Sequence, residues 1–388
     1  MARIDLLARP DHAAYIYAGL KARLDIHLHV FNAFAQGSLP ARLWPNRKQV
    51  ASGADILWAL TLGKIGLNAA RKWVNFNWRE VERRLAEWSY GRIELAGTRL
   101  VHYWPMYCQE GVRAARERYG LVTLADVYEA NPRFVNALVA EEYARFGIPM
   151  APLNTLIDQN AFFEHERHVV TASAYIEKSY AADYPNVNWH RAPYGFFGQR
   201  ANADLLRPRA NAKLRAVYVG RVCLEKGVHY LCEAMRGIDA DVELDIIGPV
   251  QTEHAPAFSR YRNQAGVNFL GGMTHREVLA RLNDYDVFVM PSLSDAYSLA
   301  VMEGLMHGLP AIVTEHTGCF GEIADYGAGA VVPIRDAEAL RRELLAFRAQ
   351  ARREAALEGI RRFDIAEAEH GFLGAMSDIY ARLLTETA

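Results

Sequence analysis

The chain has 388 residues, of which 51% are hydrophobic and 23% are charged. This is the composition of an ordinary globular protein, and it excludes collagen-like chains, disordered tails and disulfide-rich miniproteins. At roughly 100–200 residues per domain, the length predicts two domains. No uncharged apolar run approaches the roughly 18 residues that a membrane-spanning helix needs, because the nearest one, residues 56–67, is short and contains Lys64.

The first residues, MARIDLLARPDH, carry charge too early and too often for a secretory signal. The four cysteines stand without the CxxC spacing of a metal site or a redox motif, at Cys108, Cys223, Cys232 and Cys319. We therefore expect reduced thiols and a cytoplasmic location.

The formal net charge of −1 conceals an asymmetry. Residues 1–100 hold 15 basic and 8 acidic side chains, which leaves 29 basic and 37 acidic side chains for the remainder of the chain. A basic first segment is suited to an anionic membrane, a phosphorylated acceptor or nucleic acid. A solvated helical face is the alternative interpretation.

The first half of the chain predicts a doubly wound domain. Apolar strand cores stand at residues 4–7, 100–103, 121–124 and 168–171, with helical segments between them. We expect helical insertions over residues 52–88, and a linker over residues 192–209, which are rich in Gly, Pro and Arg.

The second half alternates strands and helices. We expect six strands, at residues 214–219, 242–247, 267–270, 286–291, 309–314 and 330–333. Apolar residues at helical spacing predict helices over residues 228–235 and 299–307. Thr274 and Glu277 form the capping-box pattern that begins another helix. This order implies a parallel sheet covered on both faces. An amphipathic terminal helix is expected over residues 366–384.

A glycine turn at the end of the first of these six strands is flanked by two cations. Gly220 and Arg221 are followed by Lys226, just before a helix. Such a loop can neutralise a diphosphate, because the arginine forks onto phosphate oxygens and the lysine acts as a point charge. A charged surface turn is the alternative. Neither a GxxxxGK[ST] loop nor a GxGxxG turn after a strand is present, which argues against a P-loop ATPase and a dinucleotide dehydrogenase.

The segment SLSDAYSLAVMEGLMHG, residues 292–308, places two carboxylates eight residues apart. With a helix beginning near Tyr297, Asp295 lies on the loop before it and Glu303 nearly two turns inside. The deeper carboxylate suits a ribose diol, and the one at the mouth of the helix suits sugar hydroxyls. The amides of Tyr297, Ser298 and Leu299 then point out of the helix N-terminus, which favours an anion. Asp295 as a simple helix cap is the alternative.

Four motifs together resemble the donor domain of family 4 glycosyltransferases, which are retaining GT-B enzymes that use nucleotide sugars. They are GRVCLEKGVHYL, VNFLGGMTHREVLARLNDYDVFVMPS, DAYSLAVMEGLMHGLPAIVT and TGCFGEIADYGAGAVVPIRDAEAL, in order, within residues 212–345. APYGFF also resembles the P-x-G turn that precedes the second domain in this family. The resemblance hardly reaches the first 100 residues.

The resemblance implies two Rossmann-like domains that face each other across a cleft, with a C-terminal helix crossing back. The implied boundaries are residues 1–200 for the acceptor side, 201–370 for the donor side and 371–388 for the helix. By the same resemblance Arg221 and Lys226 hold the donor diphosphate, and Glu303 binds ribose hydroxyls. Asp295 stands where the family usually has Glu, so nothing follows about the donor sugar. The remaining implied donor contacts are Gly220, Gly248, Leu270, Gly271, Ala296, Tyr297, Ser298 and Leu299.

The first half offers further candidates. His102, in the run VHYW, resembles a family histidine and is suited to contact the donor sugar, or equally to be a packed structural histidine. Trp104 replaces a second histidine of that pattern. Glu129 follows a strand end and is an acceptor-side candidate, with a solvated loop acid as the alternative. Asp11 and His12 follow the first strand, where the glycines of the family are missing.

Aromatic and basic residues alternate from Lys72 to Arg84. This pattern suits a membrane surface or a lipid-linked acceptor, and a buried helical stripe is the alternative. Nucleic-acid binding is not expected, because no recognised module accompanies the pattern.

These observations predict a metal-independent, retaining glycosyltransferase without a cofactor. Its donor is a nucleotide sugar and its acceptor a glycan, a lipid-linked sugar or a cell-envelope component. The alternatives are a GT-B epimerase or phosphorylase, and a non-catalytic protein that binds nucleotide sugars.

Overall fold

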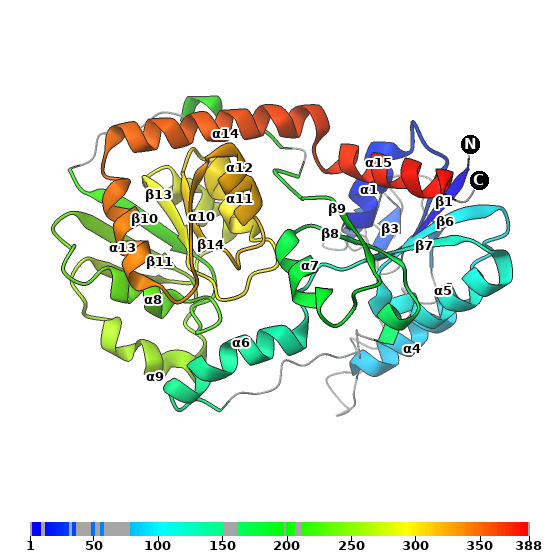
Figure 1. Ribbon diagram of the computed structural model, residues 1–388, viewed down its shortest axis with the longest axis horizontal. Helices are drawn as coiled ribbons and strands as arrows, with labels where there is room; N and C mark the ends of the chain where they lie inside the picture. Colours follow the sequence, from blue (N-terminus) through cyan, green and yellow to red (C-terminus); the bar gives the residue numbers. More distant parts are fainter. Residues whose placement is uncertain are drawn as a thin grey trace.

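The protein is described by a computed structural model, which covers residues 2–8, 12–30, 33–35, 48–50, 55–57, 78–149, 161–197, 199–205 and 212–386. It contains two parallel sheets side by side, each with helices against it (Figure 1). The expectation of two Rossmann-like domains is confirmed.

The first sheet has seven strands in the order β5-β2-β1-β6-β7-β8-β9, and every strand pair is parallel. The strands are β1 Arg3–Ala8, β2 Ile26–Val30, β5 Asp55–Ile56, β6 Thr98–Tyr103, β7 Val122–Asp126, β8 His168–Thr171 and β9 Asn188–Arg191. The helices of this half are α1 His12–Leu20, α4 Trp78–Tyr90, α5 Pro105–Tyr119, α6 Pro132–Arg145 and α7 Ala174–Ala181, with the 3₁₀ turn η1 Ala161–Glu164. A separate pair joins β3 Ala33–Ala35 to β4 Lys48–Val50.

All four strand cores expected in this half lie in strands, and the sequence misses β2 and β9. Strand β2 reads IHLHV and β9 reads NWHR, so polar side chains interrupt both apolar runs. The helical insertion expected over residues 52–88 is confirmed in part by α4, Trp78–Tyr90, whereas residues 55–56 form strand β5 instead. Residues 58–77 lie outside the described part of the chain.

The second sheet has six parallel strands in the order β12-β11-β10-β13-β14-β15. They are β10 Leu214–Val219, β11 Val242–Ile247, β12 Val267–Gly271, β13 Val287–Met290, β14 Ala311–Thr314 and β15 Gly329–Val332. The helices are α8 Val228–Ala234, α9 Ala255–Phe258, α10 His275–Leu282, α11 Leu299–Met306, α12 Phe320–Tyr326 and α13 Ala337–Ala346, with the 3₁₀ turns η3 Thr252–His254 and η4 Ser259–Tyr261. All six predicted strands are confirmed, and the capping box of Thr274 and Glu277 is formed.

The chain ends in two helices rather than the one expected over residues 366–384. Helix α14, Gln350–His370, runs along the second domain, and α15, Phe372–Thr385, lies over the first domain (Figure 1). The break falls at Gly371, where a Cβ atom would stand 2.6 Å from the carbonyl oxygen of Glu367. The Arg99 side chain donates to the backbone oxygen of Leu384 at 3.0 Å, which ties α15 to β6.

Helix α6 lies between β7 and β8 in sequence, yet it packs against the second domain (Figure 1). The ring of Tyr143 lies 5.2 Å from that of His254, and the ring of Phe146 lies 5.4 Å from that of His229. Helix α6 therefore connects the two domains. In the described part of the chain, no helix is long and apolar enough to cross a membrane.

Candidate active site

The carboxyl ends of β10, β11 and β13 meet at two glycines. Gly248 has a φ of 148°, and a Cβ atom there would stand 1.7 Å from the Gly220 carbonyl oxygen. Gly227 has a φ of 65°, and its Cβ would stand 1.9 Å from the Pro291 carbonyl oxygen. Only glycine permits these close approaches. The loop of residues 220–227 is therefore fixed at the sheet edge where open α/β folds bind ligands.

This loop brings Lys226 to Asp295. The lysine Nζ lies 2.9 Å from Asp295 Oδ2 and 3.2 Å from the Ser294 carbonyl oxygen. Both side chains are largely buried, with exposed fractions of 15% and 14%. Burial lowers the pKa of Lys226, but the carboxylates of Asp295 and Glu225 raise it more, so its pKa is raised overall. The sequence does not predict this ion pair, because it suggests Asp295 only as a sugar contact or a helix cap.

Arg221 stands at the mouth of the same loop. Its side chain is 54% exposed, and the nearest carboxylate oxygen, from Glu225, lies 3.9 Å away. A guanidinium this open is free to turn toward a bound anion.

Helix α11 begins at Leu299, where the helix predicted over residues 299–307 starts. Its N-cap, Ser298, has a φ of 69°, and its buried Oγ has no hydrogen-bond partner. The Leu299 side chain is 49% exposed. An uncapped helix N-terminus beside a buried hydroxyl without a partner leaves donors available for a bound anion.

Glu303 lies one turn inside α11 and faces the end of β12. Its Oε1 lies 2.8 Å from His275 Nε2, on the first residue of α10. Leu270 and Gly271 end β12, and the Gly271 oxygen accepts a hydrogen bond from Gly248 at 2.8 Å. The sequence identifies His275 only as part of a capping motif. Its position after a glycine turn at the carboxyl edge is the signal that distinguishes it.

The first domain contacts the loop before α11. Ser173 Oγ donates to the Ala296 oxygen at 2.8 Å, and Tyr175 OH donates to Ser294 Oγ at 2.8 Å. The side chain of Tyr297 points away from this loop, because its hydroxyl accepts from the Gly195 amide at 2.7 Å. Only the backbone of Tyr297 is therefore placed for the predicted ligand contact.

His102 is fully buried. Its Nδ1 lies 2.7 Å from the Tyr380 hydroxyl of α15, its Nε2 lies 3.4 Å from Asp126 Oδ2, and its ring stacks on Trp104 at 4.5 Å. These contacts favour the packed structural histidine over the donor contact. Trp104 is 7% exposed and is held by the same stack. We therefore do not assign His102 or Trp104 to the active site.

The remaining acceptor-side candidates are not brought together. Glu129 is an exposed residue of the loop after β7, without a side-chain partner, as the solvated-loop interpretation expects. Asp11 lies outside the described residues, and of His12 only the backbone, at the start of α1, is described. Residues 72–77 of the basic aromatic segment also lie outside them.

The sequence misses the buried carboxylate that joins the two domains. Glu142 of α6 is 3% exposed and accepts from the Tyr230 hydroxyl at 2.6 Å. Its oxygens also lie 3.2 Å from His229 Nε2 and 2.9 Å from Arg335 Nε. Burial raises the pKa of Glu142, but its hydrogen bonds and the Arg335 charge outweigh burial and hold the pKa at about 2. A single glutamate on a helix carries no motif, so only the structure identifies it.

Comparison with known proteins connects this geometry to a family. Residues 213–349, about a third of the chain, match the model of the family described as glycosyl transferases group 1. The matched segment contains Gly220, Arg221, Lys226, Asp295 and Glu303. The resemblance seen in the motifs is confirmed for the domain that carries them.

Curated relatives match about a third of the chain. The chain is 31% identical over 145 residues to a protein of Escherichia coli K12 assigned as a colanic acid biosynthesis glycosyltransferase. This alignment covers 34% of this chain and 36% of that protein. It is 33% identical over 133 residues to the D-rhamnosyltransferase WbpZ of Pseudomonas aeruginosa, over 33% and 34% of the two chains. The matched segments thus span about a third of the length of these relatives.

Solved structures match over the whole chain. Sucrose-phosphate synthase of Thermosynechococcus elongatus superposes with a TM-score of 0.65 at 18% identity and covers 100% of both chains. The lipopolysaccharide outer core galactosyltransferase WaaB superposes with a TM-score of 0.64 at 11% identity, over 98% of this chain and 99% of that one. The fold is therefore GT-B, with two Rossmann-like domains and a C-terminal helix that returns to the first of them.

Proposed function

We propose that the protein is a retaining, metal-independent glycosyltransferase. It transfers a sugar from a nucleoside-diphosphate sugar to a glycan, lipid-linked or cell-envelope acceptor. The observation that carries the proposal is the convergence of Arg221, Lys226 and the N-terminus of α11 at the carboxyl edge of the second sheet. The family match covers the same residues.

The proposed donor lies across this edge. Its diphosphate meets Arg221, Lys226 and the amides before α11, while Glu303 accepts hydrogen bonds from the ribose hydroxyls. Breaking the anomeric C–O bond places negative charge on the departing diphosphate. Fixed positive charge and oriented amides stabilise that charge as it develops. The Lys226–Asp295 pair supplies a lysine that is charged and already in position.

Two Asp-x-Asp triplets occur in the chain, at residues 239–241 and 284–286. Both precede the first residue of a strand, so they lie at the opposite edge of the sheet from Lys226. Asp241 pairs with Arg348 at 2.9 Å, and Asp286 accepts from the Arg215 amide at 2.8 Å. The proposal therefore assigns the leaving-group charge to the protein cations rather than to a metal held by these aspartates.

The first test is donor turnover. Purified protein is incubated with UDP-, GDP- and ADP-sugars, with and without a chelator, and released nucleotide is measured. Release that persists with the chelator supports the proposal, and the anomeric configuration of the product, read by NMR, tests retention. Binding without release in the presence of acceptor extracts favours the non-catalytic alternative, and isomerised free sugar favours the epimerase.

The proposed location is the cytoplasmic face of a membrane, contacted by the basic aromatic segment. The four cysteines are free and buried. Just after this segment, Trp88 of α4 is 49% exposed, and the guanidinium of Arg92, two residues past the end of α4, lies 3.8 Å from its ring centroid. Flotation with vesicles that contain anionic lipid tests the contact, and a protein that stays in the bottom fraction argues against it.

A further inference from the structure

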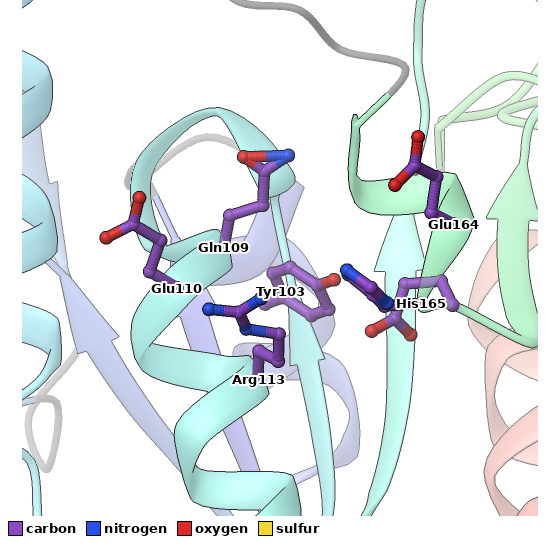
Figure 2. Close-up of a pocket in the computed structure, with 7 residues that line it drawn as sticks. Tyr103, Gln109, Glu110, Arg113, Glu164 and His165 are labelled. Carbon is purple, nitrogen blue, oxygen red and sulfur yellow. The ribbon is translucent and has the colours of Figure 1, made fainter.

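The first domain contains a polar cavity of about 190 Å³ beside α5, on a different domain from the Lys226 loop (Figure 2). At about 30 Å³ per water molecule, it has room for a small ligand or for one unit of a larger one. Its described walls come from the end of β6, from the first half of α5 and from the segment that begins at η1. The lining residues are Tyr103, Gln109, Glu110, Arg113, Glu164, His165 and Glu166.

The topology explains the position of this cavity. In a doubly wound domain, the helix between two neighbouring strands normally packs on the sheet beside the preceding helix. Helix α6, between β7 and β8, instead packs on the second domain through Glu142. The short turn η1 then lies opposite α5, and the cavity opens between them.

The floor of the cavity is buried and ordered. Tyr103 is 1% exposed and Glu166 is 7% exposed. Glu166 accepts from Thr123 Oγ1 at 2.7 Å, and its other oxygen lies 3.3 Å from Arg116 Nη1. Burial raises the pKa of Glu166. The Nε2 atom of Gln109 is buried and has no hydrogen-bond partner among the described residues, so the floor holds a donor that is available to a ligand.

The rim carries acidic and basic side chains. Glu110, Arg113, Glu164 and His165 are exposed, and among the described residues their side chains have no hydrogen-bond or ion-pair partner. Figure 2 shows Arg113 from α5 and His165 from the facing segment on either side of the Tyr103 ring, with the carboxylates of Glu110 and Glu164 directed away from the ring. The groups are thus available to a ligand.

The mixture of donors and acceptors restricts the ligand. A phosphate or carboxylate suits Arg113 but is repelled by Glu110 and Glu164. A metal ion does not suit the site, because no group of three or more ligating side chains occurs among the described residues. An ammonium group cannot accept the hydrogen bonds that Arg113 and Gln109 offer. A hydroxyl both donates and accepts, so several hydroxyls on one ring satisfy both kinds of group.

We propose that this cavity binds one neutral sugar ring of the acceptor, with hydroxyls on the charged rim and the ring against Tyr103. The part of this inference that concerns the acceptor rests on the proposed transferase function. The binding itself does not, and it can be measured without any donor.

The experiment uses the full-length protein and methyl glycosides of glucose, galactose, mannose and N-acetylglucosamine, each at millimolar concentration. Saturation-transfer NMR detects binding, and titration gives the dissociation constant. Arg113→Ala and Glu110→Gln each remove one charged hydrogen-bonding partner at an exposed position, so the fold is retained. For the glycoside that binds best, each variant raises the dissociation constant by about tenfold. Arg118→Ala, an exposed arginine later on α5, is the matched control and leaves binding unchanged.

The outcomes separate this inference from the proposed function. Binding that persists in Lys226→Ala but weakens in Arg113→Ala places the sugar in the α5 cavity, whether or not the donor is turned over. Binding that is lost in Lys226→Ala overturns the inference, because the glycoside then occupies the donor site. Failure of every glycoside to bind, or equal binding by Arg113→Ala and the control, also overturns it, even where donor turnover proves the transferase.

Discussion

The ammonium of Lys226 and the carboxylate of Asp295 form an ion pair at 2.9 Å, between the loop after β10 and the loop before α11. Each is largely buried, so each depends on the other for its charge partner. The pair joins the two segments to which we assign the donor diphosphate. With its pKa raised, Lys226 remains a cation throughout the physiological pH range.

Lys226→Ala is expected to lower the rate of sugar transfer by about 10²–10³-fold, because one group that stabilises the leaving diphosphate is removed. Nucleotide release under saturating donor measures the effect. The change also leaves Asp295 buried without its cation, so the folded state is checked by circular dichroism. Lys226→Ala,Asp295→Asn removes that unpaired charge and restores stability without restoring the rate. Turnover close to wild type in either variant would falsify the phosphate role of Lys226.

Glu303→Gln is expected to raise the dissociation constant of the donor nucleotide by about tenfold, because a neutral amide accepts ribose hydroxyl hydrogen bonds more weakly than a carboxylate. Isothermal titration with UDP, GDP and ADP measures it for each base. His275→Ala is the comparison variant, because it removes the partner of Glu303 and leaves the carboxylate in place. It is expected to raise the dissociation constant less than Glu303→Gln does. An unchanged constant in Glu303→Gln argues against the ribose contact.

The second domain was largely predictable from sequence because its strands are short apolar runs between glycine turns. In a parallel sheet the carboxyl ends of all strands lie at one edge. Loops that follow neighbouring strands therefore lie close together in space even when they are far apart in sequence. Residues such as Lys226, Asp295 and Glu303 therefore meet where the motif spacing places them.

The rest depended on contacts between distant segments. His102 lies in a strand that reads like a family motif, yet it is covered by Tyr380, 278 residues later in the chain. Helix α6 has the ordinary pattern of a crossover helix, and only the partners of Glu142 reveal that it packs on the other domain. Local periodicity identifies a helix but does not identify the surface that it covers.

Glu142→Ala is expected to lower the free energy of unfolding by about 3 kcal/mol, because the buried His229 and the half-buried Arg335 both lose their carboxylate partner. Chemical denaturation measures the change. The adjacent Glu141 also pairs with Arg335, at 3.0 Å, but its side chain is 78% exposed. Glu141→Ala is therefore the matched control, with a cost of at most about 1 kcal/mol.

The same contact predicts a response to acid. Since the pKa of Glu142 is held at about 2 in the folded protein, below the value of the free side chain, its contribution is complete above about pH 5. That contribution is lost as the pH falls toward 2. We compare the free energy of unfolding of the wild type with that of Glu142→Ala at pH 7 and at pH 3. A difference of the same size at both pH values would contradict this account of the contact.

Glu322, on α12, is expected to make the protein less stable as the pH rises. Burial, with the neighbouring charges of Glu367 and Asp325, raises its pKa from 4.5 to about 7, although the Tyr297 hydroxyl donates to it at 3.2 Å. A carboxyl whose folded pKa lies above its unfolded value holds its proton more tightly when folded. Its contribution is therefore most favourable at and below about pH 4.5 and falls as the pH rises through 7.

At about 1.4 kcal/mol per pKa unit, the change across that range is at most about 3–4 kcal/mol. Glu322→Gln keeps an oxygen for the Tyr297 hydroxyl and removes the titration. The melting temperature of the wild type, relative to that of Glu322→Gln, is then expected to fall between pH 5 and pH 8. Since every other titrating group is common to both proteins, the difference between the two melting curves isolates this carboxyl. A difference that stays constant with pH would mean that Glu322 is already ionised at pH 5, and that its carboxylate is solvated in the folded protein.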